Sequence, residues 1–257
     1  MCCPSRYNLP PMKLSIVIPA YNEENYIGPC LKAARKEIDS SGCAAEIVVV
    51  NNASTDRTAE IASRFPGVHV INEPCKGLSR ARDRGYRETR GELIANVDAD
   101  CLMPRGYIAT VLRRFERNHR LALLSGPFFY YDLPQAAQVV TRILYLFQFF
   151  PNVIGQRVLK LGAVAQGGNF VVRRSMLDKV GGFNTSLTFW GEDTDAATRL
   201  SRVGLVSFSM RLPMKTSGRR LIKEGVFRAG AAYTVNNILM IFRGRPLSRM
   251  QMDIRGV

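Results

Sequence analysis

Residues 14–19 read Leu-Ser-Ile-Val-Ile-Pro, an apolar run rich in β-branched side chains that is typical of a buried strand ended by proline. Three similar runs follow, and each comes after a stretch whose apolar residues have helical spacing. The strands are expected at residues 46–50, 68–72 and 93–97, and the helices at 25–40, 58–64 and 78–89. This fourfold alternation predicts an α/β protein with a Rossmann-like, mostly parallel sheet flanked by helices.

Beyond residue 106 the regular alternation ends. Helices are expected at residues 107–118, at 135–150 with Pro151 as the stop, and at 193–203, with strands at 121–125 and 170–173. A last amphipathic helix is expected at 223–242. We predict a disordered tail at residues 1–11, one domain over 12–222, and an amphipathic basic helix and tail over 223–257.

The net charge of +15 predicts anionic partners such as phosphates, nucleic acid or an acidic membrane. From Arg202 onward there are eleven lysine or arginine residues and two acidic ones. No segment has the roughly 18 successive apolar residues of a membrane span, and residues 1–11 lack the apolar core of a signal peptide. These features predict a cytoplasmic protein. The six cysteines include no C-x-x-C pair, so a zinc site is not expected.

Asp98 and Asp100 directly follow the strand expected at 93–97. Ligands of parallel sheets bind at the carboxyl ends of strands, and Mg²⁺ or Mn²⁺ binds through one or two carboxylates plus substrate phosphates. The pair therefore favours a metal site, although aspartates are also common in solvated turns.

Three other segments carry polar or charged side chains suited to catalysis or to substrate binding. Glu192 and Asp193 follow Trp190-Gly191 at the start of a helix, where a carboxylate serves as a general base or only as a cap. The turns at 20–24 (AYNEE) and 51–56 (NNASTD) offer polar groups to a nucleotide. The stretch 76–82 (KGLSRAR), with Lys76 and Arg82, suits a pyrophosphate.

Six segments occur in one order: VIPAYNEE (17–24), VVVNNASTDRT (48–58), KGLSRARDRG (76–85), NVDAD (96–100), GGNFVVRRS (167–175) and GGFNTSLTFWGEDTDAATRL (181–200). Their order and spacing resemble those of the family-2 glycosyltransferases with the GT-A fold. The resemblance implies an enzyme that moves a sugar, with inversion, from a nucleoside diphosphate sugar to a hydroxyl acceptor. We expect this acceptor to be a glycan or a lipid-linked molecule. It implies Mn²⁺ or Mg²⁺ and the donor at Asp98 and Asp100, and Asp193 as the base beside Glu192. Around the nucleoside it implies Pro19, Tyr21, Glu23, Asn51 and Asp56.

The sequence departs from this pattern in two places. Many relatives carry aspartate where Asn51 stands, and an amide that both accepts and donates matches uracil, which favours a UDP-sugar. Some relatives supply a late histidine to the metal, but the two histidines here, His69 and His119, lie elsewhere. Arg219 and Arg220 stand in that region. We expect them to share charge stabilisation with a metal held by carboxylate, phosphate and water.

Two other functions compete with this interpretation. A sugar nucleotidyltransferase would carry a Gly-rich phosphate loop after the first strand, where this chain has AYNEE at 20–24. A basic nucleic-acid-binding or scaffold protein would suit the charge, but the interleaved aromatic residues of a base-stacking surface are missing. No nucleic-acid partner is therefore expected.

The apolar helix at 135–150 and the basic helix at 223–242 combine aromatic side chains with arginines. This composition suits the headgroup region of an anionic membrane, so we predict peripheral association with the inner face of the membrane. The alternative is that both helices pack on the sheet or form a homodimer interface.

Overall fold

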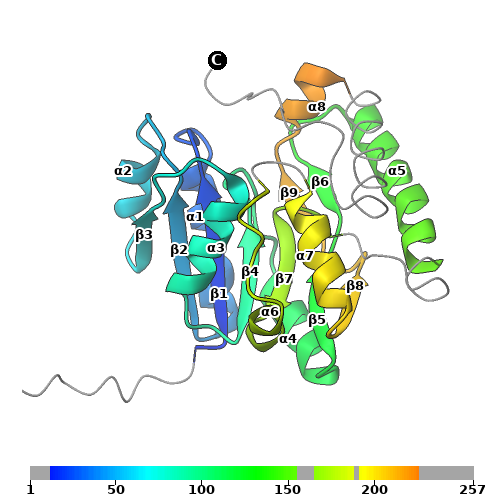
Figure 1. Cartoon of the computed structure of the whole chain (residues 1–257). Helices are drawn as coiled ribbons and strands as arrows, with labels where there is room; N and C mark the ends of the chain where they lie inside the picture. Colours follow the sequence, from blue (N-terminus) through cyan, green and yellow to red (C-terminus); the bar gives the residue numbers. More distant parts are fainter. Residues whose placement is uncertain (1–11, 155–164, 188–190, 226–257) are drawn as a thin grey trace, which may run out of the picture.

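The computed structural model describes residues 12–154, 165–187 and 191–225. Seven strands form the main sheet in the order β3-β2-β1-β4-β7-β5-β8, and β6 and β9 form a second, two-stranded sheet (Figure 1). The strands are β1 (Leu14–Ala20), β2 (Ala45–Asn51), β3 (Val68–Asn72), β4 (Leu93–Val97), β5 (Leu121–Ser125), β6 (Phe128–Tyr130), β7 (Asn169–Arg173), β8 (Leu205–Phe208) and β9 (Met214–Thr216). The helices are α1 (Ile27–Ser41), α2 (Thr58–Ser63), α3 (Leu78–Glu88), α4 (Tyr107–Arg117), α5 (Gln135–Ile154), α6 (Arg174–Lys179), α7 (Glu192–Ser201) and α8 (Arg219–Glu224).

The first four strands are parallel, which confirms the predicted α/β architecture. β1 pairs with β2 and β4, and β2 pairs with β3, all in parallel register. All seven residues of β1 are buried, as expected for a strand covered on both faces. β1 ends at Ala20, level with Asn51 at the end of β2, so the polar segments after these strands emerge at one edge of the sheet.

Alternate residues of β1 enter two different cores because successive strand side chains point to opposite faces. Leu14, Ile16 and Ile18 pack in a cluster with α1 and α4. Val17 packs in a second cluster with residues of α3, α6 and α7. The sheet is thus the middle layer of three, with helices on both faces (Figure 1).

The far half of the sheet is not parallel throughout. β7 lies between β4 and β5 and is antiparallel to both, whereas β5 and β8 are parallel. Each residue of β7 is buried. This placement brings the residues before β7 to the same edge as the residues after β4, because neighbouring antiparallel strands exchange ends.

The small sheet carries the chain back to that edge. β6 and β9 pair in parallel, and Lys215 in β9 also bridges to Leu102, just beyond Asp100. α8 begins three residues after β9 ends, so its first residue lies beside the segment that follows β4.

Two predicted helix limits are wrong. α5 continues past Pro151 to Ile154: the fixed φ of proline suits a helix, although its ring removes one backbone hydrogen bond. The last described helix, α8, spans Arg219–Glu224 and ends before Gly225, whose φ of 81° is not helical, so no continuous helix starts at residue 223. The predicted domain boundary at 222/223 thus falls within α8, and most of the helix predicted at 223–242 lies outside the described residues. Among the helices described, none is both long and apolar enough to cross a membrane.

Candidate active site

The two aspartates after β4 occupy different environments. The Asp98 side chain is 36% exposed, and its Oδ1 lies 3.3 Å from Arg82 Nη2. The Asp100 side chain is 14% exposed and pairs with Arg219. The two carboxylates are therefore each matched with a different arginine.

Two glycines allow separate acidic residues to approach the same turn. A Cβ atom added to Gly168 would lie 2.2 Å from Asp98 Oδ2, and the φ of Gly168 is +77°. A Cβ added to Gly167 would lie 3.1 Å from Asp193 Oδ2. The turn before β7 thus separates Asp98 from Asp193, and any side chain at Gly168 would collide with Asp98.

Arg82 connects the aspartate pair with the acidic start of α7. Its side chain is 0% exposed, and Nη1 donates to Glu192 Oε1 over 2.8 Å while Nη2 reaches Asp98. The guanidinium also lies 5.2 Å from the centre of the Phe170 ring. Arg82 therefore contacts the carboxylates of Asp98 and Glu192 from the protein interior. The pyrophosphate contact expected for it stays a prediction, and its burial favours a positioning role instead.

Glu192 and Asp193 form the first turn of α7, after Gly191 with a φ of 80°. Burial, with the nearby Asp193 charge, raises the pKa of Glu192 to about 7, while Arg82 opposes this shift. Burial also raises the pKa of Asp193, against Arg82 and backbone N–H groups that lower it. Asp193 Oδ1 accepts from the Thr194 N–H over 2.7 Å. A carboxylate with a raised pKa is a stronger proton acceptor, as a general base requires. Trp190 lies outside the described residues.

Arg219, at the start of α8, joins the opposite side of the aspartate pair. Its Nη2 lies 2.6 Å from Glu23 Oε1 and 3.1 Å from Asp100 Oδ2. Thr216 Oγ1 donates to Asp100 Oδ1 over 3.2 Å. Arg220 points to a different partner, with its Nε 3.7 Å from Glu224. The structure therefore brings Arg219 to Asp100, and the contact described for Arg220 is with Glu224.

The two turns predicted to hold the nucleoside are joined to each other by hydrogen bonds. Asn22 Oδ1 accepts from the Thr55 N–H over 2.9 Å, and the Glu24 N–H donates to Asp56 Oδ2 over 3.0 Å. Asn22, with a φ of 51°, adopts the left-handed conformation that asparagine tolerates. The Asp56 carboxylate is thus used to fix the loop.

The remaining predicted nucleoside residues surround this pair of turns. Pro19 lies inside β1 opposite Val50, and Tyr21 follows the strand with Lys76 Nζ 3.8 Å from its ring centre. The Asn51 amide donates to Asn72 Oδ1 over 3.0 Å and accepts from the Ser54 N–H over 3.3 Å. Its hydrogen-bonding groups thus already have partners within the protein.

Three residues with structural roles at the site were not singled out from the sequence. The close approach of Gly167 and Gly168 to carboxylates has no sequence signal beyond the glycine pair itself. Asn52 fixes the segment before α3: its amide donates to the Glu73 and Cys75 carbonyls, and its Oδ1 accepts from the Gly77 N–H over 2.8 Å. This holds Lys76 beside Tyr21.

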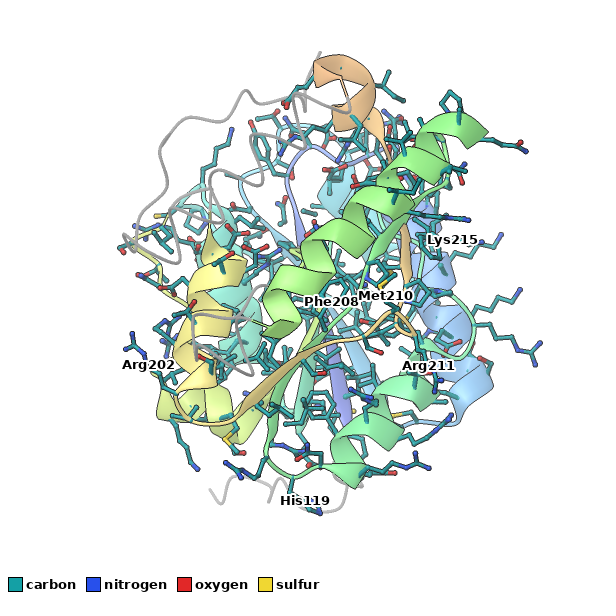
Figure 2. The ribbon with its side chains drawn as sticks, turned by 90° about the vertical axis from the view of Figure 1, so that its right-hand side faces the viewer. His119, Arg202, Phe208, Met210, Arg211 and Lys215 are labelled. Carbon is teal, nitrogen blue, oxygen red and sulfur yellow. The ribbon has the colours of Figure 1, made fainter. Side chains whose placement is uncertain are left out.

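Within the part of the chain that the structure describes, no cluster of three or more His, Cys, Asp or Glu side chains could hold a metal. Two aspartates at a strand end do fit Mn²⁺ or Mg²⁺, because such ions commonly bind one or two carboxylates and complete their shell with phosphates and water. His119 offers no ligand, since it lies at the opposite end of the molecule from α8 (Figure 2).

The family model described as glycosyl transferase family 2 matches residues 15–181, and the chain belongs to that family. A second model, described as the N-terminal domain of galactosyltransferase, matches residues 162–223.

Relatives and solved structures agree with this assignment. The "Probable glycosyltransferase YdaM" of Bacillus subtilis is 29% identical over 204 residues, which is 75% of this chain and 47% of the relative. The glycosyltransferase GlyA of Streptococcus pneumoniae is 33% identical over 106 residues, 40% of this chain and 15% of the relative. The chain therefore spans less than half the length of these two relatives.

Two solved structures share the fold. The mannosyltransferase PcManGT from Pyrobaculum calidifontis, in complex with GDP-Man and Mn²⁺, has a TM-score of 0.69 at 20% identity over 90% of this chain and 64% of that one. The glucosyl-3-phosphoglycerate synthase from Mycobacterium tuberculosis, in complex with Mn²⁺, UDP and phosphoglyceric acid, has a TM-score of 0.61 at 18% identity over 92% of this chain and 80% of that one. These likenesses confirm the predicted GT-A-like α/β fold.

Proposed function

We propose that this chain is an inverting glycosyltransferase that moves a sugar from a nucleoside diphosphate sugar to a hydroxyl acceptor. The observation that carries the proposal is the convergence of Asp98 and Asp193 on the Gly167–Gly168 turn, with Arg82 between their motifs. The donor's diphosphate and the proton acceptor would then lie on two sides of one turn. Family membership supports the same reaction class.

In the proposed reaction Asp193 accepts the proton of the acceptor hydroxyl. The acceptor oxygen then forms a bond to the anomeric carbon from the face opposite the diphosphate, and the carbon–oxygen bond to the diphosphate breaks with its electron pair. Proton transfer to a positioned base typically accelerates a reaction about 10²–10⁴-fold. Asp98 and Asp100 would hold Mn²⁺ or Mg²⁺, which supplies charge stabilisation to the departing diphosphate.

A uridine diphosphate donor is the favoured form of the proposal. The Asn51 amide can accept from the uracil N–H and donate to a carbonyl, whereas a guanine edge presents two adjacent donors. The Asn51 amide is already hydrogen-bonded to Asn72 and Ser54. To bind the base, it must therefore give up one of these bonds or share it with the base. The solved structures of the same fold include one with GDP-Man and one with UDP, so both bases belong in the test.

The experiment is a donor panel. Uridine, guanosine and other nucleoside diphosphate sugars are incubated with the protein and Mn²⁺, and release of the nucleoside diphosphate is followed, with chelator as the control. The proposal expects release from one donor, lost in chelator. If the protein bound none of the donors and released no nucleoside diphosphate, the proposal would be contradicted. Formation of a nucleoside triphosphate from donor and pyrophosphate would favour the nucleotidyltransferase alternative instead.

For the acceptor, we propose a lipid-linked molecule reached from an anionic membrane surface. α5 forms the outermost layer on one side of the molecule (Figure 2), with Val139 53% exposed and Ile143 46% exposed. Arg211 and Lys215 are exposed and lie on the same face of the molecule as α5 (Figure 2). One relative, a dolichyl-phosphate beta-glucosyltransferase of Trichomonas vaginalis, is 29% identical over 47% of this chain and 41% of its own length.

Sedimentation with vesicles tests this surface. Binding to anionic but not neutral vesicles at low salt is expected, since each basic residue near such a surface contributes about 1 kcal/mol. Val139→Ser with Ile143→Ser should weaken binding, while Leu205→Ser, which changes another exposed apolar residue, should not. Equal sedimentation of all three proteins would contradict the assignment of α5, and a homodimer interface would show instead as a change in molar mass.

A further inference from the structure

Asp100 is the second carboxylate of the proposed metal pair, and both of its oxygens are engaged. Oδ1 accepts from Thr216 Oγ1 over 3.2 Å, and Oδ2 lies 3.1 Å from Arg219 Nη2. A divalent cation that takes Asp100 as a ligand must therefore compete with a guanidinium for the same carboxylate.

Several contacts hold Arg219 in that place. Its Nη2 lies 2.6 Å from Glu23 Oε1, whose side chain is only 4% exposed, and its guanidinium lies 4.5 Å from the Tyr26 ring centre. The Arg219 guanidinium thus pairs with the carboxylates of both Glu23 and Asp100 in a poorly solvated position. A second cation placed beside it would be repelled, because like charges interact strongly where water is scarce. Metal alone should therefore bind Asp100 weakly.

The backbone before Arg219 is anchored independently of the Arg219 side chain. Asp132 accepts from the Ser217 hydroxyl and from the Gly218 N–H, each over 2.5 Å, which anchors the segment just before Arg219. The Arg219 side chain itself remains 21% exposed. A guanidinium binds phosphate with two parallel hydrogen bonds, so an arriving diphosphate offers it a strong alternative partner.

We propose that Arg219 is a substitute cation at Asp100 that makes metal binding depend on the donor. Without donor, it neutralises Asp100 and Glu23 and opposes the divalent ion. When a nucleoside diphosphate enters, Arg219 turns to the phosphates and releases Asp100 to the metal. The inference rests on the proposed function, because it takes the diphosphate to bind beside Asp98 and Asp100.

The test measures two affinities that should change in opposite directions. Binding of Mn²⁺ alone is followed by the electron paramagnetic resonance of the free ion, and binding of UDP and of GDP without metal is followed by calorimetry. Relative to the unsubstituted protein, Arg219→Gln should bind Mn²⁺ more tightly, because the competing charge at Asp100 is gone; a change of about tenfold or more is the size that groups around metal ligands typically produce. The same variant should bind the metal-free nucleotide about tenfold more weakly, because it loses a charge-assisted contact to phosphate. Arg219→Lys, which keeps the charge, should bind Mn²⁺ as weakly as the unsubstituted protein.

The controls separate this role from a structural one. Arg84→Gln removes an arginine that is 47% exposed and paired with Glu88 on α3, and should change neither affinity. Arg219→Met, which keeps the stem beside Tyr26, replaces Arg219→Gln if thermal melting shows that the glutamine variant does not fold. Loss of both affinities, or no change in either, overturns the inference while leaving the proposed function standing. An unsubstituted protein that binds neither nucleotide, with or without Mn²⁺, contradicts the proposed function itself.

Discussion

Arg82 and Glu192 lie 110 positions apart in the chain, yet the Arg82 guanidinium donates to Glu192 Oε1 over 2.8 Å within the protein interior. The contact ties α3 to the first turn of α7. Because Arg82 also reaches Asp98, the proposed donor side and the proposed base side of the site share one buried cation. The geometry of the site is therefore expected to depend on this single side chain.

Replacement of Arg82 should destabilise the fold strongly. Arg82→Met leaves the buried Glu192 carboxylate without its cation, and breaking a buried ion pair costs about 3–5 kcal/mol. The free energy of unfolding in urea measures the change. Arg84→Met on the same helix is the matched control, because its exposed pair with Glu88 should contribute about 1 kcal/mol or less. A loss for Arg82→Met no larger than that of the control would show that the pair is not buried as described.

A methyl group at Gly168 should disable the site without unfolding the protein. Gly168→Ala places Cβ 2.2 Å from Asp98 Oδ2, so the carboxylate must move, and a misplacement of about 1 Å can cost about 10²-fold in turnover. The measurement is turnover with the donor identified in the panel.

Gly181→Ala is the control for Gly168→Ala. Its φ of +80° imposes similar backbone strain, but a Cβ there meets nothing within 4 Å. Gly181→Ala should therefore lose only the stability that this backbone strain costs and keep its turnover, whereas Gly168→Ala should lose turnover as well. Equal turnover in both would contradict the contact with Asp98.

The raised pKa of Glu192 should appear in the pH dependence of stability. In the folded protein this pKa is about 7, above the ordinary value of 4.5, so the folded state keeps a proton that the unfolded state has lost. Where the folded state binds more protons, stability falls as the pH rises, and here the window runs from the ordinary value up to about 7.

Glu192→Gln removes this titration. The free energy of unfolding of the variant, relative to that of the unsubstituted protein, should therefore increase across the window and level off above it. Urea unfolding of both proteins at a series of pH values gives the difference. A difference that does not change with pH, or that changes in the opposite direction, would mean that Glu192 titrates in its ordinary range.

Much of the fold could be predicted because local patterns determine it. The runs at Val68–Asn72 and Leu93–Val97 are strands with the predicted limits, since β-branched apolar residues between polar turns leave few alternatives. The antiparallel insertion of β7 between β4 and β5 could not be predicted, because an apolar run indicates a strand but not its neighbours.

The sequence indicates which acidic residues belong to the site, but not which side chains contact them. Asp98, Asp100, Glu192 and Asp193 stood out as acidic groups at element ends. By contrast, Arg82 is one of several arginines on α3, and helical spacing alone does not reveal that its side chain is completely buried. The contact of Arg219 with Glu23 spans 196 positions and depends on β9, whose three residues give no clear sequence signal.

The most direct test of the central claim is Asp193→Asn, assayed for donor binding by calorimetry and for sugar transfer by turnover with the donor from the panel. Asparagine keeps the size of the side chain but cannot accept the acceptor's proton, so donor affinity should stay within a few-fold while turnover falls about 10²-fold or more. Glu116→Gln, on the α4 surface, is the control and should change neither quantity. Turnover of Asp193→Asn within a few-fold of the unsubstituted protein would contradict the account.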